Sequence, residues 1–167
     1  VSMRIALDAA SVDARGDSSL KPFVAGSIRA AAELGLELIY FGSQDAIDAQ
    51  LRALGFAEDG AAAAGERPGR RWRRADGLLV KVVHAPASLS LSEDPQAACR
   101  EKPEASVMRA AAEVAAKGAD ALVSAAGAGA LAAAALWHLK RLRGVLRPAL
   151  ALGLPTRRGF SLILDAG

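Results

Sequence analysis

Cysteine, aromatic residues and long apolar runs are all scarce in this chain of 167 residues. A single cysteine, Cys99, cannot form an internal disulfide or a cysteine-based zinc cluster, so we expect a reducing, cytoplasmic location and no structural metal. The longest apolar run, 128–139, is shorter than the ~20 residues that span a bilayer. The chain enters a strand-like run within its first residues, so we expect no secretory signal.

The composition is that of a folded chain with a mild positive charge. Hydrophobic residues make up 52% and charged residues 23%, which excludes a disordered chain. A mass of 17.1 kDa suits one α/β domain, or half of a larger enzyme.

Much of the net charge of +3 lies in Arg70-Arg71-Trp72-Arg73-Arg74, inside an Ala-, Gly- and Arg-rich segment, 57–77, that we interpret as an insertion loop. Such a run indicates either a solvated basic loop or a surface for phosphates, an anionic membrane or an acidic partner protein. Nothing else resembles a nucleic-acid-binding module, so we expect no nucleic-acid partner.

Strand-like and helical patterns alternate along the chain. We predict strands over 4–8, 36–41, 78–83, 119–124, 148–152 and 160–164. We predict helices over 22–35, 43–55, 103–118 and 129–142. This alternation predicts one three-layer α/β domain over 3–167, with a mainly parallel sheet and helices on both faces.

Ligands in such folds bind beyond the carboxyl ends of the strands, and the turn after 119–124 carries the clearest motif there. Gly127-Ala-Gly129-Ala-Leu-Ala132 matches the letters of the G-x-G-x-x-A dinucleotide fingerprint. The acid that the fingerprint needs about 20 residues later is absent. Three interpretations stay open: glycines that let an alanine-rich helix pack closely on its strand, a phosphate or acyl-phosphate site at a helix N-terminus, and a dinucleotide site.

Blocks of sequence spread over the whole chain carry a family resemblance. In order, they are Arg4-Ile-Ala-Leu-Asp-Ala9, Val82-Val-His-Ala85, Glu93-Asp-Pro95, Arg100, Lys102, Ser106, Ala119-Asp-Ala-Leu-Val-Ser-Ala125, Gly129-Ala-Leu131, Arg147-Pro-Ala-Leu-Ala151 and Leu162-Ile-Leu-Asp165. In this order and spacing they resemble the N-terminal half of the PlsX-type phosphate acyltransferases.

The resemblance implies a function and a fold. The function is transfer of a fatty acyl group from acyl carrier protein to inorganic phosphate, giving acyl phosphate for phospholipid synthesis without a cofactor or metal. The implied fold is the isocitrate/isopropylmalate dehydrogenase-like fold, in a homodimer or completed by a second half. A peripheral membrane contact is a further expectation.

The resemblance also implies a set of site residues. The candidate catalytic residues are His84, Lys102 and Ser106. The candidate substrate- or phosphate-binding residues are Asp8, Asp13, Arg100, Ser124, Gly127 and Gly129. Simpler roles remain open for some of them, since His84 suits a structural histidine at a strand end, and acids at strand ends often cap the next helix.

Several polar positions of the family pattern differ here. Gly127 and Ala128 stand where the family has Asn and Thr, and Ser11-Val12-Asp13 replaces Gly-Gly-Asp. Two hypotheses therefore stand side by side: an active phosphate acyltransferase, and a catalytically silent homologue that acts as a binding or assembly subunit.

Overall fold

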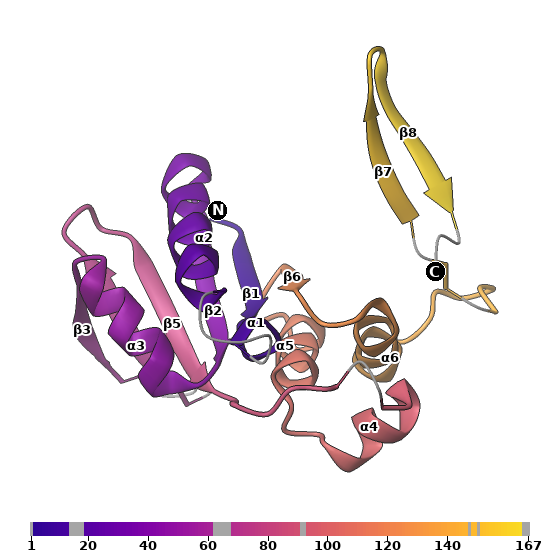
Figure 1. The fold of residues 1–167 in the computed structure, drawn as a ribbon, viewed down its shortest axis with the longest axis horizontal. Coiled ribbons are helices and arrows are strands. Elements are labelled where there is room, and N and C mark those ends of the chain that lie inside the picture. Colours follow the sequence, from indigo (N-terminus) through magenta and orange to yellow (C-terminus); the bar gives the residue numbers. More distant parts are fainter. Residues whose placement is uncertain are drawn as a thin grey trace.

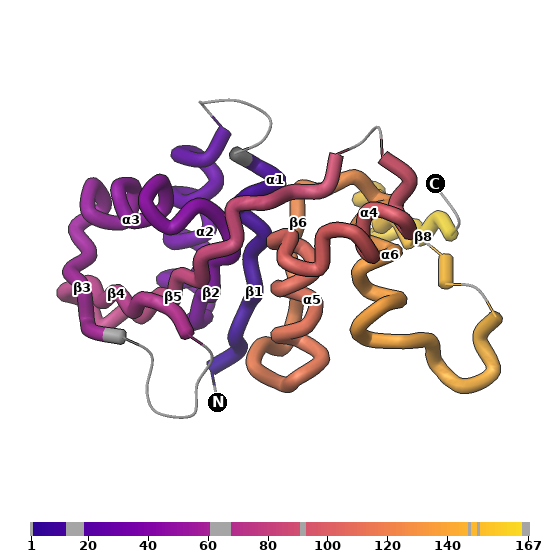
Figure 2. The backbone as a smooth tube through the Cα atoms, turned by 90° about the horizontal axis from the view of Figure 1, so that it is seen from below, coloured from indigo at the N-terminus to yellow at the C-terminus, as the bar shows by residue number. Residues whose placement is uncertain are grey.

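A six-stranded sheet organises the chain, seen in a computed structural model that describes residues 2–13, 19–61, 68–90, 93–146, 148–149 and 151–164. Four parallel strands lie in the order β5-β2-β1-β6 (Figures 1 and 2). Their bounds are β1 Arg4–Asp8, β2 Glu37–Gly42, β5 Leu79–His84 and β6 Ala121–Ser124. The predicted α/β fold, with a mainly parallel sheet and helices on both faces, is confirmed.

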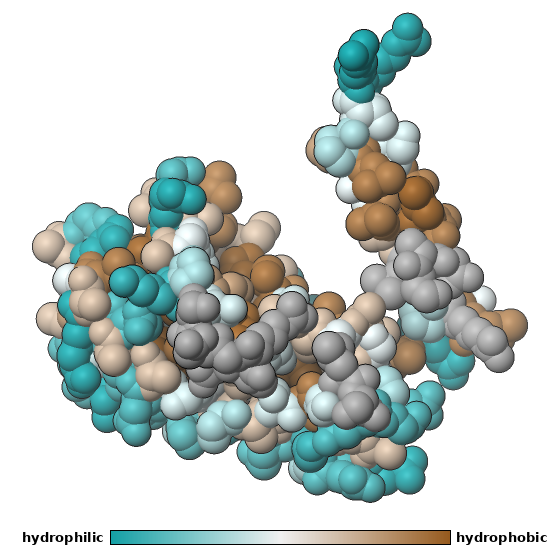
Figure 3. Space-filling view, in the orientation of Figure 1, coloured by the Kyte–Doolittle hydropathy of each residue, from teal (hydrophilic) through white to brown (hydrophobic). Residues whose placement is uncertain are grey.

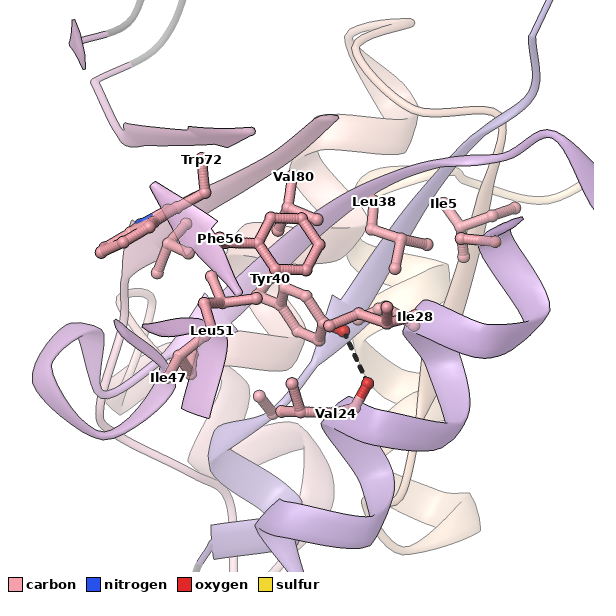
Figure 4. Packing of buried hydrophobic residues seen from close by; sticks show 14 of the residues in the cluster. Ile5, Val24, Ile28, Leu38, Tyr40, Ile47, Leu51, Phe56, Trp72 and Val80 are labelled. Atoms are coloured by element: carbon pink, nitrogen blue, oxygen red, sulfur yellow. Dashed lines mark hydrogen bonds between the residues drawn. The ribbon is translucent and has the colours of Figure 1, made fainter. Parts of the chain in front are cut away.

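Two helices, α2 (Leu20–Leu34) and α3 (Gln44–Ala53), cover one face of the sheet. Helix α2 buries Val24 and Ile28 at helical spacing, and Gly35 ends it in a left-handed conformation with φ 66°. These side chains pack around Tyr40, which comes up from β2 (Figure 4). Apolar burial of this kind is the main stabilising contribution to such a fold.

The opposite face is covered by α5 (Ser106–Ala115), with α4 (Pro95–Glu101) and α6 (Ala128–His138) beside it. Helices α4 and α6 pack on each other, around a second apolar cluster that includes Met108 and Ala134 (Figure 2). Helix α4 lies in a segment for which the sequence predicted none. Its start is marked by Asp94, whose side chain accepts a hydrogen bond from the Ala97 amide at 2.8 Å.

The segment expected to be an insertion loop, 57–77, contains sheet strands. Strand β3 (Phe56–Ala61) pairs antiparallel with β4 (Arg70–Arg74), and β4 pairs antiparallel with β5. Trp72 is 1% exposed, because side chains alternate between the two faces of a strand and this one points into the core. The strand was not predicted from the sequence, because arginines occupy both of its faces and the usual alternation of apolar and polar residues is absent.

The last two strands, β7 (Ala151–Thr156) and β8 (Gly159–Leu164), pair with each other as a separate antiparallel hairpin. The hairpin projects from the rest of the chain in Figure 1, and Figure 3 shows apolar residues on the part nearer the rest of the chain and hydrophilic residues at its tip. Phe160 and Leu162 are 82% and 67% exposed. Within the described ranges, no helix combines the length and the apolar character that crossing a membrane requires.

Candidate functional site

Asp8, the last residue of β1, is the centre of a buried hydrogen-bond network. Its Oδ2 accepts bonds from the hydroxyls of Ser11 and Ser124, both at 2.6 Å. Its Oδ1 accepts from the Ser11 amide at 3.2 Å and from the Ser106 hydroxyl. A carboxylate offers about four acceptor positions, so this one is saturated. The structure therefore brings together three of the predicted site residues, Asp8, Ser106 and Ser124.

The fold explains why these three meet. Strands β1 and β6 are parallel neighbours in which Asp8 pairs with Ser124, so their carboxyl ends lie side by side. Ser106 begins α5, which packs across the same end of the sheet. Asp8 and Ser106 are both fully buried, whereas Ser124 is only partly buried. In this arrangement Ser124 is the member of the network that faces the surface.

Ser124 shapes the turn that follows it. Its Oγ accepts a hydrogen bond from the Ala126 amide at 2.9 Å while donating to Asp8. Gly127 then forms the N-cap of α6 in an extended conformation and provides no side-chain cap. The first amides of α6 thus follow directly on the Asp8 network, and the N-terminal end of a helix favours an anion.

Gly129 has a packing role that the structure makes explicit. A Cβ at this position would lie 3.1 Å from Cγ of Pro95, so the glycine permits close approach of α6 to α4. Of the three interpretations of the glycine motif, close packing of the helix applies at Gly129, although the neighbour is α4 rather than a strand. The anion interpretation rests on the amides at the start of α6.

His84, at the end of β5, lies two strands away from Asp8. The order β5-β2-β1 puts the two residues at the same sheet edge, about 10 Å apart from strand spacing. Its Nδ1 accepts a hydrogen bond from the Gln44 amide at 3.4 Å, and its carbonyl oxygen accepts one from Arg109 at 2.7 Å. The side chain is exposed, so His84 borders the network without joining it.

Arg100 lies in the last turn of α4, and Lys102 directly follows that helix. Lys102 Nζ pairs with Oε1 of Glu93 at 2.5 Å, and this bond lowers the pKa of the Glu93 carboxyl, helped by the Ser90 amide. Arg100 is exposed and forms no ion pair with any described residue. No contact joins either cation to Asp8 in the described part of the chain, so the predicted site is divided between the network and α4.

Two other predictions need separate mention. Asp13 ends the short helix α1 (Ala10–Asp13), and its side chain lies outside the described residues. In the arginine run, Arg70, Arg73 and Arg74 pair with Asp48, Asp59 and Asp76 at 2.5, 2.9 and 2.6 Å. Much of the charge expected for a phosphate, membrane or protein partner is therefore neutralised within the chain.

The sequence analysis missed two contributors to this region. Ser11 gives Asp8 two of its hydrogen bonds, and its position three residues after an acid at a strand end is the local signal for such a turn. Pro95 packs against α6 and had no signal, because its partner is distant in sequence. No group of three or more His, Cys, Asp or Glu side chains in the described ranges is placed to hold a metal ion.

Comparison with known families gives one clear match. The profile of the fatty acid synthesis protein family matches residues 70–167, more than half of the chain.

Curated relatives extend the similarity to nearly the whole chain. The phosphate acyltransferase of Elusimicrobium minutum is 39% identical over 165 residues, which are 99% of this chain and 42% of the relative. That of Heliobacterium modesticaldum is also 39% identical, over 99% of this chain and 43% of the relative. That of Pelotomaculum thermopropionicum is 36% identical, over 99% and 41%. The chain thus spans about two fifths of the length of these relatives.

Proposed function

Because this chain belongs to the fatty acid synthesis protein family, whose PlsX-type members include relatives named phosphate acyltransferase, we propose that it forms the N-terminal part of an acyl-transfer site. The reaction proposed is transfer of a fatty acyl group from acyl carrier protein to inorganic phosphate. The observation that carries the proposal is the saturated Asp8 network, which holds Ser124 and the first turn of α6 at the carboxyl end of the sheet.

The proposed step is a displacement at a thioester. An oxygen of phosphate attacks the carbonyl carbon, a C–O bond forms, the C–S bond breaks, and the released thiolate takes the proton that phosphate gives up. Phosphate is itself the nucleophile, so the protein needs to position both substrates and stabilise the oxyanion. The amides at Gly127, Ala128 and Gly129 are the groups suited to an oxyanion or a phosphate oxygen.

The remaining residues take roles that follow from their exposure. Asp8 and Ser106 are fully buried, so within the proposal they are positioning residues that act through Ser124. Lys102 and Arg100 are the cations available to phosphate, and Lys102 is already oriented by Glu93. His84 is exposed at the same sheet edge and is suited to passing the proton that phosphate gives up to the leaving thiolate.

The second candidate function is a catalytically silent binding or assembly subunit. Gly127 and Ala128 carry no side-chain hydrogen-bonding group, so the turn offers only backbone amides to a ligand. In addition, the cations Lys102 and Arg100 lie at α4 and do not contact the Asp8 network. Both observations favour a protein that has kept the fold of the family and lost some of the side chains that would bind substrate.

The proposal extends to assembly and location. A second copy of the chain, or a segment that the longer relatives possess, would cover the exposed apolar hairpin β7–β8, because an uncovered hairpin of this kind is prone to association. We propose a cytoplasmic protein, a homodimer or a larger chain, with the isocitrate/isopropylmalate dehydrogenase-like fold. A peripheral membrane contact remains part of the proposal.

The deciding experiment is acyl phosphate formation from acyl carrier protein thioester and phosphate, trapped with hydroxylamine. The proposal expects turnover that Lys102→Met reduces at least tenfold and that Lys21→Met, which removes an exposed lysine on α2, leaves unchanged. Absence of turnover by a chain shown to be folded by circular dichroism, both alone and when it is joined to the segment that the longer relatives possess, would contradict the enzyme. Retained binding of the carrier protein in that case would support the silent subunit.

A further inference from the structure

A cleft lies at the amino-terminal edge of the main sheet, opposite the edge that carries the Asp8 network. Its volume is about 390 Å³, which falls within the range of ~300–1,000 Å³ typical of small-molecule sites. The starts of β1, β2 and β5 line it, together with β4 and the end of α5. None of the residues that line it belongs to the proposed acyl-transfer site, so the two sites can be tested separately.

The position of α5 leaves this cleft open. Helix α5 packs on β1, β2 and β6, whereas β4 and β5 lie on the far side of β2 from β1 (Figure 2). Trp72 in β4 and both Val80 and Val82 in β5 point into the core that α3 covers. Because neighbouring side chains of a strand point to opposite faces, Arg71 and Lys81 point to the other face, beside the end of α5.

Two cations stand directly opposite each other on that face. Arg71 of β4 pairs in register with Lys81 of β5, and like charges in this position destabilise a sheet. Arg71 is half-buried and forms no ion pair with any described residue, whereas Arg70, Arg73 and Arg74 pair with aspartates. A local rule broken without compensation inside the fold is typical of a functional position.

A carboxylate lies across the cleft from these cations. Glu37 begins β2, and β5 separates β2 from β4, so strand spacing puts the Cα atoms of Glu37 and Arg71 roughly 12 Å apart. Glu37 is exposed and forms no ion pair with any described residue. The surface between the two charges is apolar and includes Ile39 and Leu79.

The other two charged residues that line the cleft are directed to the end of α5. Arg4 lies 3.8 Å from a carboxylate oxygen of Asp120 and donates a hydrogen bond to the carbonyl oxygen of Lys117 at 2.8 Å. Glu113 is buried, and its Oε1 occupies the space that a Cβ at Gly118 would need. The cleft therefore presents a cationic side on β4 and β5 and an acidic side at the start of β2.

We propose that this cleft binds an aliphatic ω-amino carboxylate, with its carboxylate on Arg71 and its ammonium group on Glu37. A guanidinium binds a carboxylate through two parallel charge-assisted hydrogen bonds, and a carboxylate accepts hydrogen bonds from an ammonium. The methylene groups between the two ends lie over Ile39 and Leu79, which removes them from water. A simple anion would meet Glu37 and a simple cation would meet Arg71, so the ligand needs both charges.

Soluble probes test this chemistry by calorimetry. The reference ligand is 6-aminohexanoate. Hexanoate lacks the ammonium group and hexylamine lacks the carboxylate, so we expect each to bind at least tenfold more weakly. Added salt is expected to weaken the binding of 6-aminohexanoate, because partly exposed charges are screened.

Lysine offers the same chemistry from two sources, the free amino acid and the C-terminal residue of a polypeptide. Both carry a side-chain ammonium group, a methylene chain and a carboxylate. Only the free amino acid also carries an α-ammonium group. Preference for Nα-acetyl-lysine over lysine assigns a polypeptide C-terminus, and the reverse preference assigns the free amino acid.

Matched variants locate the two ends of the ligand. Arg71→Gln is expected to weaken 6-aminohexanoate at least tenfold and to leave hexylamine unchanged. Glu37→Gln is expected to weaken 6-aminohexanoate five- to tenfold and to leave hexanoate unchanged. Arg143→Gln and Glu33→Gln remove exposed charges outside the cleft and are expected to leave all binding unchanged.

Arg71→Gln also tests the pair of cations in the absence of ligand. The variant removes a like charge opposite Lys81, so the midpoint of thermal unfolding is expected to stay the same or to rise. Loss of binding in this variant is then separate from loss of folding. A lower midpoint would contradict the proposal, because it would show that Arg71 serves the fold.

Three binding results would overturn the proposal. Equal affinity for hexanoate and 6-aminohexanoate would remove the role of Glu37. Unchanged affinity in Arg71→Gln would show adventitious binding elsewhere on the chain. Absence of saturable binding up to about 10 mM 6-aminohexanoate, where the binding free energy is only about −3 kcal/mol, would exclude the site. None of these results depends on whether the chain transfers acyl groups.

Discussion

The Ser106 hydroxyl donates a hydrogen bond to Oδ1 of Asp8, a residue 98 positions earlier in the chain. Both side chains are fully buried, so this bond ties the start of α5 to the end of β1 inside the protein. It also completes the set of donors that keeps the Asp8 carboxylate satisfied. The geometry of the Ser124 turn depends on this arrangement, because Ser124 is held through the same carboxylate.

Removal of that hydroxyl is expected to destabilise the fold. Ser106→Ala should lower the free energy of unfolding by about 1.5–3 kcal/mol, the usual contribution of a hydrogen bond to a buried charged group. Urea denaturation measures the change. Ser161→Ala, on the exposed hairpin, is the control and should stay within about 0.5 kcal/mol of the parent. Equal stability of the two variants would contradict the network.

The contact of β4 with α3 should depend on one hydrogen-bond acceptor, the carboxylate of Asp48. Asp48 is buried and accepts hydrogen bonds from Trp72 Nε1 at 2.9 Å and from Arg70, while burial raises the pKa of its carboxyl. Asp48→Asn keeps an acceptor for Trp72 and removes a buried charge, so its cost should be within about 1 kcal/mol.

The paired variant Asp48→Ala removes the acceptor altogether. It leaves the buried indole N–H of Trp72 unsatisfied and should cost about 1–3 kcal/mol more than Asp48→Asn in urea denaturation. If the two variants cost the same, the ion pair with Arg70, which both of them remove, and not the bond to Trp72 would hold β4 in place.

Two glycines in helices should respond oppositely to alanine. A Cβ at Gly129 would meet Pro95 at 3.1 Å, whereas a Cβ at Gly26 in α2 meets nothing within 4 Å. Gly26→Ala should raise stability by about 0.5–1 kcal/mol, because alanine favours the helical backbone. Gly129→Ala should lose that gain or reverse it, as measured by thermal unfolding. An equal gain at both sites would show that α4 and α6 are not held in close contact.

The ion pair between Glu93 and Lys102 should be visible in a pH titration. The hydrogen bond from Lys102 lowers the pKa of Glu93 below its unfolded value of about 4.3. The stabilisation is therefore present above that value and is lost as pH falls through the lower folded pKa. NMR of labelled glutamate side chains should show the pKa of Glu93 rising in Lys102→Met but not in Lys117→Met. A pKa that stays unchanged in Lys102→Met would contradict the pair.

Prediction from sequence succeeded where the signal was local and periodic. The buried run 4–8, the glycine stop at Gly35 and the strand before Ser124 all lie close to the observed bounds. It failed for α4 and for the strand at Arg70–Arg74, because a short helix has little periodicity and arginines occupied both faces of the strand. The hairpin β7–β8 was predicted as two strands but not as a unit separate from the main sheet.

The amino-acid sequence by itself determined the α/β class, the family and the polar residues available for chemistry. The hydrophobic pattern and the order of the motifs are local properties that can be read without coordinates. Only the tertiary structure decided which of those residues meet. Three of them are far apart in the chain but meet in the fold: Asp8, Ser106 and Ser124. They converge because β1 and β6 are parallel neighbours under α5. Lys102 does not join them, because its side chain forms an ion pair with Glu93. Long-range pairing of this kind depends on the packing of whole elements, which no short stretch of sequence encodes.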